Sequence, residues 1–228
     1  MSFEPCQDGP ISRMARTGTR KIPHPNYANA ILKKARGDEL FRQGDRSARC
    51  INIFSGWIAL RLVLEDGRCQ IVEFGLPGDE VGLALAPDIG REFSAIALTE
   101  VRYMSSLNAD LVDRFRSDAT VGPWACQTLE DQYRKMLNNF VAMVSRSAEE
   151  RVAFLLHDLA VRVRGTLRTG DRICIPLTQE TVCHATGLSF GHVNRVLKRL
   201  ERRKVLSLRR GMLTILNRHA FEALVRFP

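Results

Sequence analysis

Apolar and polar positions change their spacing along the chain. From about residue 28 to residue 106, short apolar runs typical of β-strands alternate with turn sequences at residues 43–45, 65–67 and 77–79. Glycine accepts the positive φ of tight turns and aspartate caps its own turn, so these sequences end strands. The pattern predicts an antiparallel sandwich or barrel, with strands at residues 39–41, 50–54, 57–64 and 69–74.

Helical spacing begins after residue 107. Asn108 is expected to cap a short helix through Phe115, and Gly122-Pro123 opens a longer one, because proline loses no hydrogen bond in a first helical turn. Its apolar residues recur at steps of three and four, typical of a heptad seam: Cys126, Leu129, Tyr133, Met136, Phe140 and Met143. This stripe either packs on the protein's own core or pairs with a second copy about a two-fold axis, which is the more economical use.

A helix-turn-helix pattern follows in the last third. Ser147 and Glu150 form a capping box that starts a helix running to about residue 164, and a short strand is expected at 173–176. Thr178 caps a helix over 179–186 with Val182 and Ala185 facing inward, and Gly187 permits a sharp turn.

The second helix of this pattern starts after Ser189. Its inward face is apolar, and two apolar runs at 205–208 and 213–216, joined by residues 209–211, predict a β-hairpin wing. A final helix is expected after Asn217. The inward residues are Val193, Val196, Leu197 and Leu200.

Charge is distributed unevenly along the chain. Residues 1–145 contain 18 Lys and Arg and 18 Asp and Glu, whereas residues 146–228 contain 16 and 7, so the whole net charge of +9 lies in the last third. A solvated basic surface would have this composition, and so would a polyanion-binding module joined to a neutral one. The helix-turn-helix pattern favours the second interpretation, with double-stranded DNA as the polyanion.

Several segments, taken together, resemble the Crp/Fnr family of bacterial transcription regulators over about residues 35 to 228. These segments are Phe41-Arg42-Gln43-Gly44-Asp45, Leu76-Pro77-Gly78-Asp79-Glu80-Val81-Gly82-Leu83, Leu177-Thr178-Gln179-Glu180, Gly187-Leu188-Ser189 and His192-Val193-Asn194-Arg195. The resemblance implies a cyclic-nucleotide-binding-type barrel that senses a signal, a dimerisation helix and a winged helix. It also implies that the signal alters the spacing of two recognition helices.

The chain departs from that family at its ligand-binding positions. Nucleotide-binding members have a Glu after the Pro-Gly-Asp segment and an Arg before a Ser or Thr, where this chain has Leu83 and Phe93. A buried cyclic phosphate without its Arg would be unpaired, so cyclic AMP is not the expected effector. Oxygen-sensing members of the family hold an iron-sulfur cluster with several cysteines near the N-terminus. This chain has only Cys6 there, which cannot supply the four thiolates of such a cluster. We expect no cofactor.

The recognition helix starts differently from many relatives, with Phe190-Gly191 in place of an Arg-Glu pair. Arg195 is the expected guanine reader, because its planar fork matches O6 and N7 together. Phe190 either touches a thymine methyl or folds back to pack, and Asn194 either reads adenine or holds a phosphate. The expected DNA-binding residues are Thr178, Gln179, Ser189, Phe190, Gly191, His192, Asn194, Arg195, Lys198, Arg199 and Arg209.

Two alternatives are weighed against this interpretation. A metal-dependent enzyme built on the barrel is poorly supported, because none of the five histidines falls in that segment. We therefore expect neither a metal site nor an enzyme. A redox sensor at Cys183 would require neighbouring cations to lower the thiol pKa, whereas a small apolar filler is the simpler interpretation of this residue.

The sequence therefore predicts an α+β fold and a cytoplasmic, DNA-binding homodimer. We expect a flexible arm over 1–26, a jelly-roll barrel over 27–107, a dimerisation helix region over 108–146 and a winged helix-turn-helix over 147–228. No run of apolar residues is long enough for a membrane span. RNA polymerase and a small effector other than cyclic AMP stay open as further partners.

Overall fold

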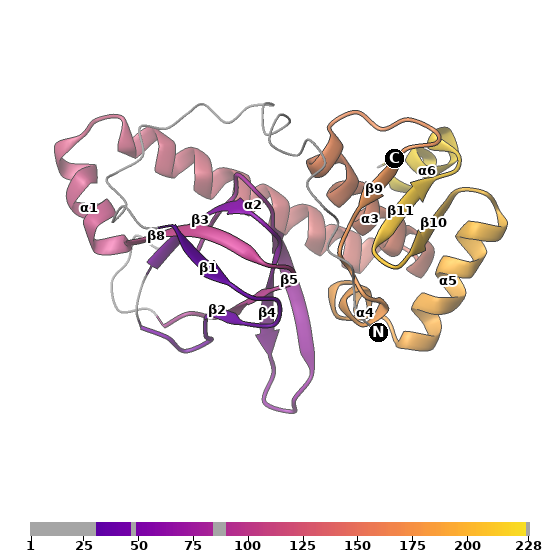
Figure 1. Ribbon diagram of the computed structural model, residues 1–228, viewed down its shortest axis with the longest axis horizontal. Helices are drawn as coiled ribbons and strands as arrows, with labels where there is room; N and C mark the ends of the chain where they lie inside the picture. Colours follow the sequence, from indigo (N-terminus) through magenta and orange to yellow (C-terminus); the bar gives the residue numbers. More distant parts are fainter. Residues whose placement is uncertain (1–30, 47–48, 84–89, 227–228) are drawn as a thin grey trace. The chain divides into compact units, whose positions relative to one another are not determined.

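The computed structural model describes residues 31–46, 49–83 and 90–226 (Figure 1). The chain forms two compact units, one ending at Val144 and the other beginning at Ser145. We call them the sheet unit and the winged-helix unit. The arm predicted over residues 1–26 lies outside the described residues.

The sheet unit contains two four-stranded antiparallel sheets, with strand orders β1-β8-β3-β6 and β2-β7-β4-β5. This arrangement confirms the predicted jelly-roll fold. The sequence pattern identified β2 to β5 but missed β1 and β6 to β8, which are short, polar or rich in small residues. The strands are β1 Leu32–Lys34, β2 Glu39–Phe41, β3 Arg49–Ser55, β4 Ile58–Val63, β5 Cys69–Gly75, β6 Glu80–Val81, β7 Ser94–Ala97 and β8 Val101–Leu107.

Apolar side chains from both sheets form one core cluster. Burial of each large side chain contributes about 1.5–3 kcal/mol, so this cluster supplies much of the stability of the unit. Leu40 and Phe93 pack against it from its margin. Its buried members are Phe41, Ile51, Ile53, Ile58, Leu60, Val81, Ala95, Ala97, Val101 and Tyr103.

Helix α1 (Asn108–Ser117) begins without the predicted side-chain cap. The residue at the N-cap position is Leu107, and Asn108 is already helical. The Asn108 side chain is buried and its Nδ2 donates to the carbonyl oxygen of Gly82 at 3.2 Å. The amide therefore joins the helix to the strand segment after β6, so the prediction that it caps α1 was wrong.

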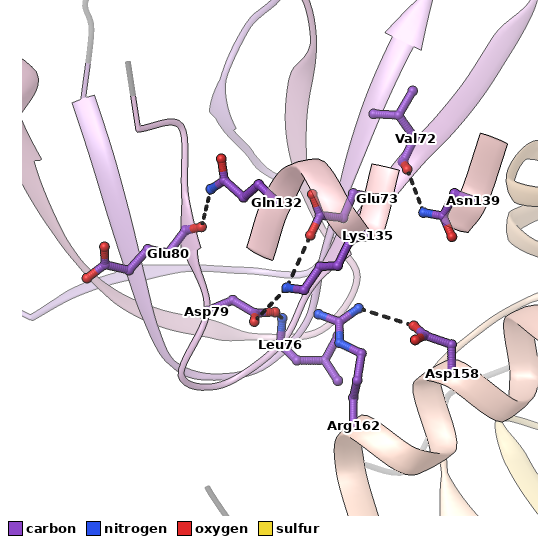
Figure 2. Close-up of polar contacts among 10 residues, drawn as sticks. All are labelled: Val72, Glu73, Leu76, Asp79, Glu80, Gln132, Lys135, Asn139, Asp158 and Arg162. Carbon is purple, nitrogen blue, oxygen red and sulfur yellow. Dashed lines mark hydrogen bonds and ion pairs between the residues drawn. The ribbon is translucent and has the colours of Figure 1, made fainter. Parts of the chain in front are cut away.

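Helix α2 (Val121–Ser145) attaches one face to the sheets through polar contacts (Figure 2). Lys135 Nζ lies 3.4 Å from Glu73 Oε1 and 3.3 Å from Asp79 Oδ1. Gln132 Nε2 and Asn139 Nδ2 donate to strand carbonyl oxygens at 3.1 and 3.3 Å. These contacts fix which face of α2 is turned toward the sheets.

The winged-helix unit combines helices with a small antiparallel sheet of strand order β10-β11-β9. Ser147 and Glu150 form the predicted capping box at the start of α3. The core includes Val152, Leu156, Leu159 and Phe221. The elements are α3 Ala148–Arg164, β9 Arg172–Cys174, α4 Gln179–Thr186, α5 Phe190–Arg202, β10 Leu206–Arg209, β11 Met212–Ile215 and α6 Arg218–Val225.

The wing hairpin is one residue tighter than predicted. Arg209 pairs with Met212, so the turn consists of Arg210 and Gly211 alone. Both have positive φ, at 50° and 74°, the geometry of a two-residue hairpin turn whose twist matches the strands. Arg209 therefore belongs to β10 rather than to the loop at the tip. Asn217 caps α6 as predicted.

Candidate DNA interface

Two local caps and one glycine build the helix-turn-helix. The Thr178 hydroxyl accepts from the backbone N–H of Thr181 at 3.1 Å, and the Ser189 hydroxyl accepts from that of His192 at 3.4 Å. Gly187 ends α4 in the left-handed conformation with φ 67°, which a residue with a Cβ adopts at a cost. These short-range contacts confirm the predicted boundaries of α4 and α5.

The inward face of α4 differs from the prediction at one position. Val182 is buried as expected, but Thr186 is buried and Ala185 is half-exposed. The Thr186 hydroxyl donates to the carbonyl oxygen of Val182 at 2.7 Å. This bond satisfies the only polar atom of the side chain, so threonine can occupy a core position that the pattern assigned to alanine.

Helix α5 lies at the surface of the winged-helix unit (Figure 1). Its apolar face is buried and its basic face is exposed. All four predicted inward residues are buried. Phe190 is 59% exposed, so the alternative in which it folds back to pack does not describe this structure. His192 and Asn194 are half-exposed, and the other outward residues, which are exposed, are Gly191, Arg195, Lys198, Arg199 and Arg202.

The basic residues fall into two groups. Among the described residues, no acidic side chain pairs with Arg195, Lys198 or Arg202. By contrast, Arg199 Nη1 lies 3.5 Å from Glu149 Oε2 and Arg209 Nη2 lies 2.6 Å from Glu201 Oε1. The first group presents uncompensated charge to an external anion, whereas the second is already partly neutralised.

Polar contacts also link the two helices at the outer surface. Asn194 Nδ2 donates to Gln179 Oε1 at 3.4 Å, which joins two predicted DNA-binding residues. Arg195 leans toward the start of its helix, because its Nη1 would lie 3.7 Å from a Cβ added to Gly191. The guanidinium therefore shares the N-terminal part of α5 with Phe190, the part that enters a major groove in helix-turn-helix proteins.

A second candidate surface is the face of α2 turned away from the sheets. Tyr133, Met136 and Phe140 of the predicted stripe are 61%, 62% and 63% exposed. Cys126 and Leu129 are also exposed, and Met143 is half-exposed. The stripe is therefore not packed on the core of the chain. Leu137 and Val144 extend the exposed apolar face, and the heptad pattern had missed both of them.

Comparison with known proteins identifies the family. A model described as a cyclic nucleotide-binding domain matches residues 32–117, and one described as a Crp-like helix-turn-helix domain matches residues 150–224. A probable transcriptional activator from Rhizobium leguminosarum bv. viciae is 32% identical over 183 residues, 75% of this chain and 71% of that protein. The chain belongs to the Crp/Fnr family of bacterial transcription regulators.

Further members of the Crp/Fnr family match the same regions. The nitrogen fixation regulation protein FixK of Bradyrhizobium diazoefficiens is 28% identical over 193 residues, 82% of this chain and 78% of that protein. The structure of FixK2 from Bradyrhizobium japonicum has the same fold, with a TM-score of 0.79 at 20% identity over 87% of this chain and 98% of that one. The protein is a DNA-binding transcription regulator of the Crp/Fnr type.

The two positions at which the family resemblance leads us to expect nucleotide-binding residues are apolar and packed in this chain. Leu83 is buried in a cluster with Cys50, Val121, Trp124 and Ala125. The ring of Phe93 lies 6.0 Å from that of Phe41, centroid to centroid, at the margin of the core. Leu83 and Phe93 are therefore both part of the packing of the sheet unit.

Arg91 is a half-buried cation that the sequence pattern did not single out. Its guanidinium donates to the backbone oxygens of Gly82 and Arg49 and lies 4.0 Å from the centroid of the Phe41 ring. Burial lowers its pKa below the ordinary value of arginine. In the sequence, only its position two residues before Phe93 could have drawn attention to Arg91. Its contacts with the backbone of Gly82 and Arg49 cannot be predicted from a local sequence pattern.

Cys183 and the metal-ligating residue types bear on the two alternative functions. Burial raises the pKa of the Cys183 thiol, the opposite of the lowering that the redox alternative assumed, so a packing role fits better. Within residues 31–46, 49–83 and 90–226, no group of three or more His, Cys, Asp or Glu could hold a metal ion. Over the same ranges, no helix is long and apolar enough to cross a membrane.

Proposed function

We propose that the protein binds DNA as a homodimer and inserts one α5 helix from each protomer into successive major grooves of an inverted-repeat operator. The observation that carries this proposal is the outward face of α5, where Arg195 and Lys198 are exposed and have no acidic partner among the described residues. Half-site centres should lie about one helical turn, roughly 34 Å, apart.

The homodimer is proposed from the exposed face of α2. Leu129, Tyr133, Met136 and Phe140 are spaced as in a heptad seam and are all exposed in the single chain. Burying one such large side chain contributes roughly 1.5–3 kcal/mol. Within the described part of the chain, no other helix exposes a comparable apolar stripe, so pairing of α2 with α2 of a second copy is the most economical assembly.

Different parts of α5 are proposed to make different DNA contacts. Arg195 reads a guanine, because only the guanidinium fork matches O6 and N7 of one base. Phe190, with its exposed ring, contacts a thymine methyl, and the Gln179–Asn194 pair presents its remaining amide groups to the groove. Thr178, Ser189 and His192 position the helices through their caps, while Gly191 leaves room for Arg195.

The proposed phosphate contacts are ranked by their ion pairs. Lys198 binds phosphate without giving up an acidic partner. Arg199 and Arg209 each have a carboxylate neighbour, so each contributes less to DNA affinity than Lys198 does.

The signal is proposed to be something other than a cyclic nucleotide. A cyclic phosphate needs a paired cation when it is buried, and Leu83 and Phe93 supply none. Arg91 is engaged by two backbone oxygens and an aromatic ring, so recruiting it to a ligand would break these contacts.

Selection of bound sequences from a random DNA library tests the proposed function. We expect an inverted repeat whose half-sites each contain an invariant guanine, with centres about one turn apart. The same selection with Arg195→Ala should lose the preference at that guanine and keep the repeat. Enrichment of single, unpaired half-sites, or of no sequence at all, would contradict the proposal.

A further inference from the structure

Glu149 holds two arginines of the recognition-helix region. It lies in the first turn of α3, and its side chain is only 12% exposed. One carboxylate oxygen accepts from Arg199 Nη1 at 3.5 Å, and the other accepts from Arg203 Nη1. Arg199 lies in the last turn of α5 and Arg203 follows its final residue, so one acidic side chain offsets part of the positive charge at this end of the helix.

The remaining cations of α5 have no such partner. Arg195, Lys198 and Arg202 are exposed and unpaired among the described residues. Free cations near the DNA contribute sequence-independent affinity by displacing counterions from phosphates. A cation that already has a carboxylate partner contributes less, because the two charges cancel at the distance of a phosphate.

We propose that Glu149 determines DNA specificity by withholding Arg199 and Arg203 from phosphates, so that the protein binds random DNA weakly. This inference rests on the proposed docking of α5 in the major groove. Glu149 is not proposed to contact a base. It positions the side chains of Arg199 and Arg203 and acts on DNA binding only through them.

The withheld charges matter more on random DNA than on the operator. On the operator, base contacts by Arg195 fix the position of α5, so freed arginines reach only the phosphates nearby. On random DNA the protein is free to slide to the position with the most phosphate contacts. Releasing Arg199 and Arg203 should therefore raise random-DNA affinity more than operator affinity, and the ratio of the two should fall.

Glu149→Gln tests this directly, because glutamine keeps the size and the acceptor oxygen while removing the charge. Fluorescence anisotropy with a random-sequence duplex, repeated over a range of salt concentrations, should give roughly three- to tenfold tighter binding. The slope of log affinity against log salt should become steeper by about one unit for each released arginine that gains a phosphate contact. Glu222→Gln is the matched control: it removes a carboxylate paired with Arg218 on α6, and it should change neither quantity.

A second pair of variants leaves Glu149 untouched. Arg203→Gln removes a held cation and should leave the salt slope unchanged, whereas Lys198→Gln removes a free one and should lower it by about one unit. Melting temperatures establish that each variant is folded. Equal behaviour of Glu149→Gln and Glu222→Gln, or equal loss of slope in Arg203→Gln and Lys198→Gln, would overturn the inference.

Arg195→Ala, measured in parallel, separates this inference from the proposed function. If Arg195→Ala weakens only the operator while Glu149→Gln has no effect, the docking of α5 stands and the role of Glu149 is wrong. If Arg195→Ala weakens operator and random DNA equally, the proposed docking itself is wrong.

Discussion

Two cations of the sheet unit and two cations of α5 in the winged-helix unit differ in the partners that they have. In the sheet unit, Lys135 lies between two carboxylates and Arg91 is held by backbone oxygens and an aromatic ring. In the winged-helix unit, Arg195 and Lys198 point outward without an acidic partner among the described residues. Net charge follows the same division, with zero over residues 1–145 and +9 over residues 146–228.

This difference separates cations that stabilise the fold from cations that are available to an anion. A charge surrounded by its own chain strengthens packing but has little affinity left for a ligand, whereas an unpaired, solvated charge supplies affinity for phosphate. Composition alone does not distinguish the two. The apolar residues divide similarly, because Leu83 and Phe93 pack within the sheet unit while Tyr133 and Phe140 remain exposed on α2.

The largest effect should come from the exposed face of α2. Phe140→Asp places a charge in the proposed dimer seam, so sedimentation at micromolar concentration should give a monomer. Operator affinity should fall at least roughly a hundredfold, because the two half-sites are no longer bound together. Asn138→Asp, at an exposed polar position of the same helix, is the control and should remain dimeric. A dimeric Phe140→Asp protein would show that the seam lies elsewhere.

A substitution at Gly82 tests the tight packing around Arg91, with a smaller expected effect on the protein. Gly82 has φ +78°, and a Cβ there would meet the Arg91 guanidinium and lie 2.9 Å from the carbonyl oxygen of Arg49. Gly82→Ala should therefore lower the free energy of unfolding by about 1–3 kcal/mol, measured by urea denaturation.

Gly37→Ala is the control for this measurement. Gly37 has φ +91° with nothing within 4 Å of an added Cβ, so alanine there brings strain without a clash. Its loss of stability should be the smaller of the two. Equal losses would mean that Arg91 moves aside freely and is not held as described.

Addition of a cyclic nucleotide should change neither the heat of titration nor the DNA affinity of the protein. Calorimetric titration of cyclic AMP or cyclic GMP into the protein should release no heat above dilution, because Leu83 and Phe93 provide neither a ribose nor a phosphate partner. DNA affinity should likewise be unchanged by either compound. Micromolar binding would contradict the proposal that the apolar, packed positions Leu83 and Phe93 leave no site for a cyclic nucleotide.

The winged-helix unit was the more predictable part of the molecule, for a physical reason. Its helix boundaries depend on contacts between residues three apart, such as Thr178 with Thr181 and Ser189 with His192, and on a left-handed glycine at 187. Local contacts of this kind can be predicted from residue types and their spacing in the sequence. The inward face of α5 follows in the same way from its helical period.

The errors and omissions involve partners that are distant in sequence. Asparagine is a residue type that often caps helices, but the side-chain amide of Asn108 donates a hydrogen bond to Gly82, 26 residues away. In the sequence, Glu149 lies within the capping box at the start of α3, yet its ion-pair partners Arg199 and Arg203 lie 50 and 54 residues further along the chain. No local pattern distinguishes a free arginine from a held one, so the division of the basic face required the structure.

Helix α5 is proposed to read bases with Arg195 and to bind phosphates with Lys198. The deciding measurement is the affinity of the parent, Arg195→Ala and Lys198→Ala for the selected operator and for a random duplex across salt concentrations. Arg195→Ala should cost roughly 1–3 kcal/mol on the operator and little on random DNA. Lys198→Ala should weaken both about equally and lower the salt slope by about one unit. If Arg195→Ala weakens both duplexes equally, α5 does not read the operator as proposed.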